Sequence, residues 1–248
     1  EYLYVKKNHE EHEIRAAGAL LLQRGWLHKS SPDNTLLNVG ANIGMTCIAL
    51  IKAGYFEYAL AFEPEPENFR FLKKNIDQNG LNNRIQAFRL ALSSVTGDFT
   101  LELSRDNPGD HRLRQSGQAA KGFFGEENRR TIVVPCETLD RFNERRPSHI
   151  DAIWVDIQGH EGHFFRGAQS VLKKGIPVVT EFWPYGLARA GTNREELVAI
   201  LSPLFSHFWV IGNEKFRHCP IHDITRLFDV YCEPRSFGLV LLEPPRHS

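Results

Sequence analysis

A strand, a glycine-containing turn, a helix and a second strand follow one another between Leu36 and Glu63, and this order constrains the fold more than any other feature. The first strand ends at Val39 and opens into the turn Gly40-Ala41-Asn42-Ile43-Gly44. After an apolar helix, the strand Tyr58–Phe62 ends on Glu63, about 20 residues past the turn, where an acid usually contacts ribose hydroxyls. The pattern predicts an open α/β sheet that binds an adenosine-containing ligand.

The turn does not match the sequence of a diphosphate site. A dinucleotide fold needs G-x-G-x-x-G, but counting from Gly40 the second and third glycine positions hold Asn42 and Met45. No Lys or Arg occurs from Leu36 to Ile51, and the Gly-Lys-Ser/Thr of a P-loop is absent. S-adenosylmethionine has no phosphate and carries a sulfonium cation, which carbonyls and carboxylates suit. The sequence favours this ligand, with a plain strand-turn-helix without a ligand as the alternative.

A second candidate strand end follows Ala152–Val155. It reads Asp156-Ile157-Gln158-Gly159-His160-Glu161 and leads into a helix. In an open sheet this end should lie beside the Gly40 turn, where the strand order reverses. We expect Asp156 to orient the substrate or take its proton, His160 to act as a general base, and Glu161 to be a third catalytic residue.

Each of these three residues also has a structural interpretation. Glu161 suits the first turn of a helix, where an acid complements the helix dipole. His160 suits an exposed loop, and Asp156 suits a turn. The Asn/Asp-Pro-Pro-aromatic run of methylases that modify exocyclic amines of nucleic acids is absent here, which disfavours that class.

Two metal sites are weaker alternatives, and we expect no metal. Asp156, Glu161, His163 and Glu181 have the chemistry for a hard cation. His218-Cys219-Pro220-Ile221-His222 suggests half of a zinc site, but a second close pair is missing. Trp183-Pro184-Tyr185 would either wall a substrate pocket or pack against the last helix.

Composition limits the class of partner. The chain has 248 residues, with 30 basic and 30 acidic side chains, so the basic excess of a nucleic-acid-binding surface is lacking. The four cysteines are widely spaced and do not form a disulfide framework, which favours a reducing cytoplasm. No apolar run approaches a membrane span and no signal peptide opens the chain. We expect a cytoplasmic protein.

Alternation of strands and helices predicts a mostly parallel sheet within 31–248, preceded by a helical cap over 1–30. Phe99–Leu103 and Thr131–Val134 are predicted as two additional antiparallel strands. The segment 104–130 between them has no periodicity and is either a surface loop or a substrate lid. The remaining expected elements are helices 9–24, 43–51, 66–79, 161–174 and 194–201, and strands 85–92, 177–182, 208–211 and 237–242.

Taken together, these segments resemble the FkbM-type S-adenosylmethionine-dependent methyltransferases over roughly 35–182. The segments that match, in chain order, are Asn38-Val39-Gly40-Ala41-Asn42-Ile43-Gly44, Ala61-Phe62-Glu63-Pro64, Leu90-Ala91-Leu92-Ser93, Thr138-Leu139-Asp140, Val155-Asp156-Ile157-Gln158-Gly159-His160-Glu161 and Arg166-Gly167-Ala168.

The resemblance implies a class I Rossmann-like sheet, seven-stranded and mostly parallel with an antiparallel last strand. It also implies O-methylation of sugars or natural products. Gly40, Asn42 and Gly44 would contact the methionine end of the cofactor, Glu63 the ribose, and Ala91 and Leu92 the adenine. Asn38, Ala41, Pro64 and Asp156 complete the expected cofactor site. Asn38 stands where the family usually has Asp, and His160 where it has mostly apolar or aromatic residues.

The sequence therefore predicts an S-adenosylmethionine-dependent O-methyltransferase that acts on a hydroxyl of a small molecule or glycan. One alternative is a nicotinamide-dependent oxidoreductase on the same sheet. The other is a non-catalytic module that retains the cofactor pocket.

Overall fold

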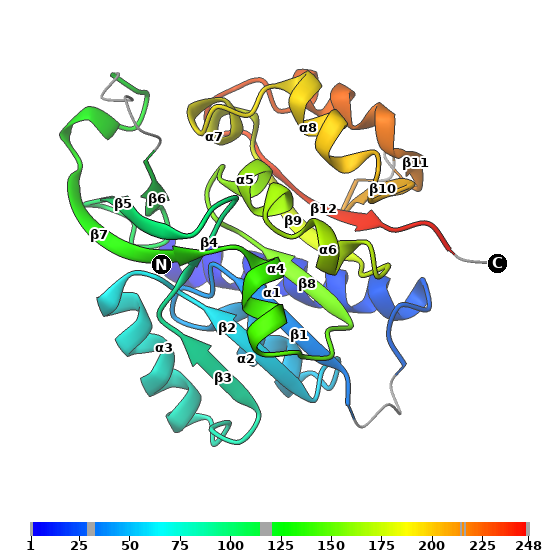
Figure 1. The fold of residues 1–248 in the computed structure, drawn as a ribbon, viewed down its shortest axis with the longest axis horizontal. Helices are drawn as coiled ribbons and strands as arrows, with labels where there is room; N and C mark the ends of the chain where they lie inside the picture. The colour runs from blue at the N-terminus through cyan, green and yellow to red at the C-terminus, as the bar shows by residue number, and fades with distance from the viewer. Residues whose placement is uncertain (1, 29–32, 115–120, 214, 216, 247–248) are drawn as a thin grey trace.

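The structure is a computed structural model that describes residues 2–28, 33–114, 121–213, 215 and 217–246. These residues form an eight-stranded sheet and a separate four-stranded sheet (Figure 1). In spatial order, the strands of the large sheet are β11 (Cys219–Pro220), β10 (His207–Val210), β12 (Gly238–Glu243), β9 (Val178–Phe182), β8 (Ala152–Val155), β1 (Thr35–Val39), β2 (Tyr58–Phe62) and β3 (Ile85–Phe88).

The direction of the strands confirms the predicted sheet. β1 pairs in parallel with β2 and β8, β2 with β3, and β8 with β9. β12 runs antiparallel to both of its neighbours, β9 and β10. The strand order reverses at β1, so the carboxyl ends of β1, β2 and β8 meet at one edge. The two-residue β11 was not predicted and adds the eighth strand.

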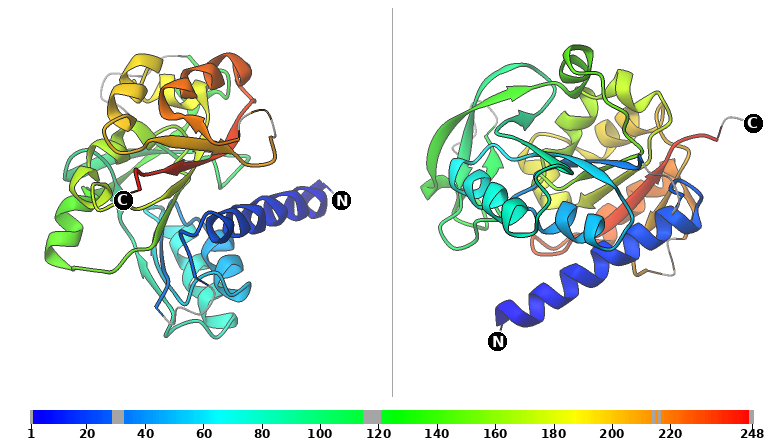
Figure 2. Two further views of the ribbon diagram at one scale, coloured as in Figure 1. Left: turned by 90° about the vertical axis from the view of Figure 1, so that its right-hand side faces the viewer. Right: turned by 90° about the horizontal axis from the view of Figure 1, so that it is seen from below.

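Successive residues of the central strands face opposite sides, because side chains alternate along a strand. Each side has its own buried cluster, and both are covered by helices (Figure 2). Leu37, Ile153, Val178 and Val240 pack into the first cluster. Leu36, Ala152, Val179 and Leu241 pack into the second. The sheet is thus the middle layer of three, which explains the nearly continuous apolar runs of its strands.

The helices divide between these two clusters. α1 (Tyr2–Gln23), α2 (Met45–Lys52) and α3 (Pro66–Gln78) contribute to the second cluster. The first cluster takes residues from α4 (Leu139–Arg145), α5 (Glu161–Arg166), α6 (Gln169–Leu172), α7 (Pro184–Arg189), α8 (Arg194–Leu201), η3 (Ile221–Arg226) and α9 (Leu227–Val230). α8 begins at a capping box formed by Asn193 and Glu196, in agreement with the predicted start.

The small sheet contains the predicted pair of additional strands, β5 (Gly97–Leu103) and β7 (Arg130–Glu137), which are antiparallel. The predicted strand 85–92 is wrong in one respect, because it divides between the two sheets. β3 ends at Phe88, and β4 (Ala91–Leu92) pairs with β7 of the small sheet. Segment 104–130 also contains β6 (Arg112–Leu113) and η1 (Glu126–Asn128). Residues 115–120 of that segment lie outside the described residues.

The predicted helix 161–174 is also wrong, because it is interrupted between α5 and α6. The interruption falls at Gly167, where a Cβ atom would overlap the backbone carbonyl oxygen of Ser93. The backbone of the small sheet therefore approaches this helix too closely for any side chain. The close contact docks the small sheet against the first cluster.

The N-terminal helix α1 packs against α2 through the predicted positions Ile14, Ala17 and Leu21, all of them buried. It begins earlier than predicted, at Tyr2 rather than near His9. No helix among the described residues combines the length and apolar character that a bilayer crossing requires.

The chain that follows α1 is joined to the last strand by the buried carboxylate of Glu243. This carboxylate accepts hydrogen bonds from Arg24 Nε at 2.8 Å and from the indole N–H groups of Trp26 and Trp209 at 2.8 and 2.7 Å. Burial alone would raise the pKa of Glu243, but the hydrogen bonds from these three donors outweigh burial and hold its pKa below the usual range.

Replacement Glu243→Gln is expected to lower the free energy of unfolding by about 1–3 kcal/mol at pH 7, since an amide nitrogen would then face a donor. A carboxyl with a lowered pKa stabilises the fold above its unfolded-state pKa of about 4.3, and this contribution is lost as the pH falls through the folded-state pKa. The difference should therefore shrink near pH 3. Urea unfolding at both pH values measures it. Glu144→Gln, at an exposed position of α4, is the control, and equal effects at pH 7 would contradict the assignment.

Candidate active site

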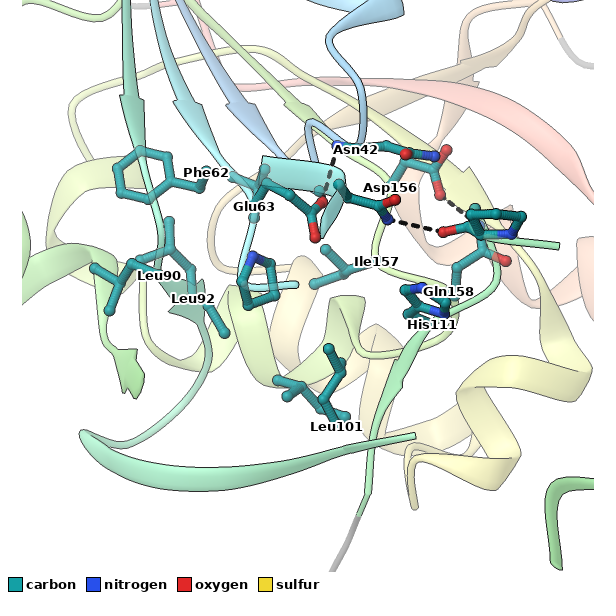
Figure 3. Close-up of a pocket in the computed structure, with 18 residues that line it drawn as sticks. Asn42, Phe62, Glu63, Leu90, Leu92, Leu101, His111, Asp156, Ile157 and Gln158 are labelled. Atoms are coloured by element: carbon teal, nitrogen blue, oxygen red, sulfur yellow. Dashed lines mark hydrogen bonds between the residues drawn. The ribbon is translucent and has the colours of Figure 1, made fainter. Parts of the chain in front are cut away.

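A cavity of about 630 Å³, its open mouth included, lies where the carboxyl ends of β1, β2 and β8 meet (Figure 3). The residues that line it are Val39, Gly40, Asn42, Phe62, Glu63, Pro64, Asn68, Leu90, Ala91, Leu92, Leu101, Pro108, Gly109, His111, Leu113, Asp156, Ile157 and Gln158. Phe62, Leu90 and Leu92 give one end an apolar lining, and Gln158 and His111 lie at the other end (Figure 3).

The first wall is the turn after β1. Gly40 has φ of 76°, a conformation that glycine adopts without steric cost. A Cβ atom there would overlap the backbone carbonyl oxygen of Asp156, so no other residue fits without a shift of the backbone. Asn42 also has positive φ, at 50°, and its side-chain Oδ1 is buried without a hydrogen-bond partner. The turn thus offers an unsatisfied acceptor beside the cavity.

Glu63 occupies the middle of the cavity, between its apolar and polar ends (Figure 3). Its two carboxylate oxygens accept the backbone N–H groups of Asn42 at 2.9 Å and Glu65 at 2.8 Å. These bonds fix the carboxylate and leave further lone pairs for a ligand. Burial raises the pKa of Glu63 to about 7, against the opposing effect of the two N–H groups.

Another wall of the cavity is the loop after β8, which begins with Asp156. The backbone N–H of Asp156 donates to Val39 O at 3.1 Å, which joins this loop to the end of β1. Gln158 has φ of 56° and its side-chain amide donates to Asp156 at 2.7 Å and to Glu181 at 3.3 Å. Burial, together with the charges of Asp156 and Glu161, raises the pKa of Glu181 well above its usual value. Acidic groups therefore gather at the polar end of the cavity.

The structure places His160 and Glu161 outside the cavity, although both were expected in the catalytic site. Gln158 and Gly159 both have positive φ, and after them the chain enters the interior, where each of the next two side chains is 2% exposed. Glu161 Oε1 accepts the N–H groups of Ile157 at 3.0 Å and Gly159 at 3.3 Å, so it holds the loop that carries Asp156. Burial raises the pKa of Glu161 to about 7.

His160 contacts the small sheet instead of the cavity. Its Nε2 lies 2.7 Å from Ser93 Oγ, and its ring stacks on His163 at 4.4 Å between centroids. Burial and the neighbouring His163 lower the pKa of His160 to about 3, so its ring is neutral. A neutral, enclosed imidazole that bonds Ser93 links the two sheets.

Of the residues expected to bind the cofactor, some line the cavity and others do not. Gly40, Asn42, Glu63, Pro64, Ala91, Leu92 and Asp156 line the cavity, whereas Asn38, Ala41 and Gly44 do not. Asn38 lies within β1 and is 1% exposed, and both polar atoms of its side chain lack a hydrogen-bond partner. Gly44 caps the start of α2. These three residues therefore lie behind the surface that a ligand would contact.

The outer wall of the cavity comes from segment 104–130, which was expected to be either a surface loop or a substrate lid. Pro108, Gly109, His111 and Leu113 belong to the segment without periodicity and lie over the strand ends. Asn68 Nδ2 donates to Pro108 O at 2.9 Å, which ties this wall to α3. Asn107-Pro108-Gly109 signals a turn, but nothing local indicates where the turn lies in space. The described part of segment 104–130 is thus a structured wall of the cavity.

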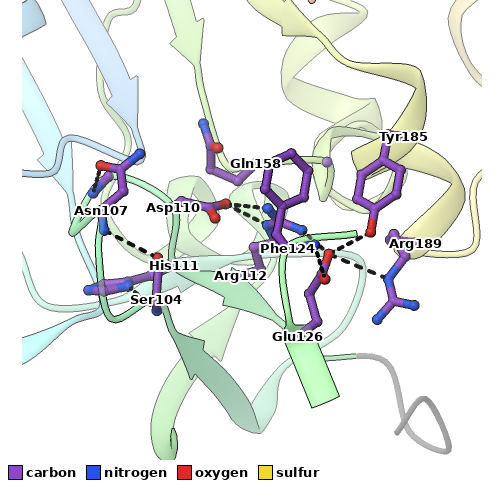
Figure 4. A network of polar contacts seen from close by, with 12 residues as sticks. Ser104, Asn107, Asp110, His111, Arg112, Phe124, Glu126, Gln158, Tyr185 and Arg189 are labelled. Carbon is purple, nitrogen blue, oxygen red and sulfur yellow. Dashed lines mark hydrogen bonds and ion pairs between the residues drawn. The ribbon is translucent and has the colours of Figure 1, made fainter. Parts of the chain in front are cut away.

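A buried ionic network connects this wall to α7 (Figure 4). Arg112 donates to Asp110 at 2.6 Å and to Glu126 at 2.8 Å, and Tyr185 O–H donates to Glu126 at 2.7 Å. Arg129 also pairs with Asp110. Trp183 is buried and packs against Arg112, whose guanidinium carbon lies 4.5 Å from the ring centroid. The predicted rim aromatics therefore support the wall rather than line the cavity.

Neither metal alternative has a ligand set in the described residues, where no group of three or more His, Cys, Asp or Glu side chains is placed to hold an ion. His163, one of the proposed ligands, instead contacts the backbone oxygen of Ala190 at 2.8 Å. His218 stacks on His207 at 4.2 Å.

Comparison with known proteins gives matches in sequence and in structure. The family model described as methyltransferase FkbM domain matches residues 38–205. The curated 2-O-methyltransferase NoeI of Sinorhizobium fredii (strain NBRC 101917 / NGR234) is 25% identical over 159 residues, which cover 61% of this chain and 64% of that protein. The chain thus spans less than two thirds of the length of this relative.

The fold is shared with a solved structure, methyltransferase FkbM from Methylobacillus flagellatus KT. It matches with a TM-score of 0.51 and 16% identity, over 85% of this chain and 44% of that one. This likeness concerns the fold alone and confirms the predicted class I methyltransferase sheet. Since the family model covers more than half of the sequence, the chain belongs to the FkbM methyltransferase family.

Proposed function

We propose that this protein is an S-adenosylmethionine-dependent O-methyltransferase that acts on a hydroxyl group of a small molecule or glycan. The observation that carries the proposal is the charge of the cavity. Its lining contains the carboxyl groups of Glu63 and Asp156, and none of its described residues is Lys or Arg. A diphosphate would meet two acids and no Lys or Arg side chain, whereas a sulfonium cation suits such a lining.

The residues present fit this cofactor. Glu63 has lone pairs left to accept the ribose hydroxyls, after its two backbone bonds. The unsatisfied Oδ1 of Asn42 and the Gly40 turn suit the methionine end. Phe62, Leu90 and Leu92 suit the adenine, at the apolar end. Asn38, in place of the usual Asp, lies behind this surface and carries no charge.

The bound cofactor would supply an electrophilic methyl group, and the protein would align an acceptor oxygen with it. We place Asp156 at this step, since it lines the polar end of the cavity and can take a proton from the hydroxyl. Glu161 and His160 are assigned positioning roles, because they hold the loop after β8 and the small sheet. The name of the similar protein NoeI, a 2-O-methyltransferase, supports a hydroxyl acceptor.

The choice of cofactor can be tested by calorimetry. We expect S-adenosylhomocysteine to bind with a measurable heat and a 1:1 ratio, and NADH to show no binding, because its diphosphate would face Glu63 and Asp156. Tight NADH binding without a response to S-adenosylhomocysteine would favour the oxidoreductase alternative.

The role of Glu63 predicts a pH dependence. Ribose hydroxyls donate more strongly to the carboxylate than to the protonated acid, so S-adenosylhomocysteine should bind more tightly as the pH rises through about 7, the pKa of Glu63. In Glu63→Gln the affinity should fall by about tenfold at pH 8, and its pH dependence should flatten. Glu65→Gln is the matched control, since Glu65 is a buried helix cap outside the cavity. Equal effects of the two changes would contradict the assignment.

A methyl-transfer assay distinguishes the catalytic role proposed for Asp156 from the positioning role proposed for His160. Mass spectrometry of a panel of hydroxylated acceptors, incubated with the protein and S-adenosylmethionine, should reveal a product heavier by one methylene. Asp156→Asn should reduce transfer by about 100-fold or more while S-adenosylhomocysteine still binds. His160→Gln should lower the unfolding temperature and leave the rate per folded molecule nearly unchanged. A binding-competent wild-type protein that methylates no acceptor would favour the non-catalytic alternative.

A further inference from the structure

His111 lies at the polar end of the cavity, near Gln158 (Figure 3). It directly precedes β6, in the outer wall that no sequence motif identified. Among the described lining residues it is the one side chain that can carry a positive charge, since the other ionisable groups there are Glu63 and Asp156.

The hydrogen bond to one ring nitrogen of His111 determines whether the other ring nitrogen carries a hydrogen. The backbone N–H of Ser104 donates to Nδ1 at 3.1 Å, so Nδ1 carries no proton (Figure 4). A neutral imidazole that accepts at Nδ1 must carry its hydrogen on Nε2. Burial and the charge of Arg129 lower the pKa of His111, against the opposing charges of Glu65 and Asp110. The ring therefore presents Nε2–H as a donor at neutral pH.

Two other side-chain amides of the lining, those of Asn68 and Gln158, already donate to protein oxygens. The amide nitrogen of Asn68 donates to Pro108 O at 2.9 Å. The amide nitrogen of Gln158 is shared between Asp156 and Glu181. The methionine part of the proposed cofactor ends in a carboxylate, and a carboxylate in this acidic surrounding needs a donor. His111 supplies such a donor, the Nε2–H group, on the side of the ring opposite the bond to Ser104.

On the basis of the proposed function, we propose that His111 binds the carboxylate of the cofactor's methionine moiety through its Nε2–H. His111 is then a cofactor-binding residue contributed by the outer wall. The bond would also hold that wall closed over the bound cofactor, because Nδ1 of the same ring is tied to Ser104.

Two substitutions separate this role from a purely structural one. In His111→Asn the side-chain oxygen can still accept from Ser104 N–H, as Nδ1 does, but the donor that would reach the ligand is lost. In His111→Gln the longer amide places a donor near the position of Nε2, and the acceptor for Ser104 is lost. Calorimetry should use S-adenosylhomocysteine, which has the carboxylate, and 5′-methylthioadenosine, which has the same nucleoside without it. Thermal unfolding establishes that each variant is folded.

We expect His111→Asn to bind S-adenosylhomocysteine about tenfold more weakly than the wild type, and 5′-methylthioadenosine within about twofold. His111→Gln should retain more of the affinity for S-adenosylhomocysteine than His111→Asn. Unchanged binding by His111→Asn, or an equal loss for both ligands, would overturn the inference and leave the proposed function intact. A wild-type protein that binds neither ligand would overturn the proposed function, and this inference with it.

Discussion

The contact between the Gly40 turn and the Asp156 carbonyl determines the geometry of the whole site. It brings the ends of β1 and β8 so close that no side chain fits between them. Gly40 also donates its N–H to Phe62 O at 3.0 Å, so the end of β2 is fixed to the same turn. Three strand ends are thereby held together through backbone atoms. Glu63 and Asp156 therefore line one cavity.

This geometry could be anticipated from the sequence where the signal is local. The strands β1, β2 and β8 are short apolar runs, each followed by a glycine or an acid, and β2 and β8 begin and end where the sequence predicts. The residues of the Gly40 turn and Glu63 were identified for the same reason. Ala91 and Leu92 were also found, but their sheet was not, because Leu90 and its neighbours carry no sign of a change of partner.

Other parts of the site depend on contacts between distant segments. His160 and Glu161 follow the end of β8, and for this reason the sequence predicted that their side chains face the cavity. A left-handed backbone at Gln158 turns both inward, and glutamine gives no sequence signal for that conformation. The outer wall around His111 is placed by Asn68, by Glu126 and by Tyr185, from three separate parts of the chain. No pattern within 104–114 encodes those partners.

The cavity is closed by a second sheet that is small and has its own minor cluster of buried residues. That sheet is joined to the main body by the close approach at Gly167, by the bond between Ser93 and His160, and by the ionic network at Arg112. A ligand held between the two sheets would contact both. The free energy of its binding would therefore also oppose the local unfolding of the small sheet.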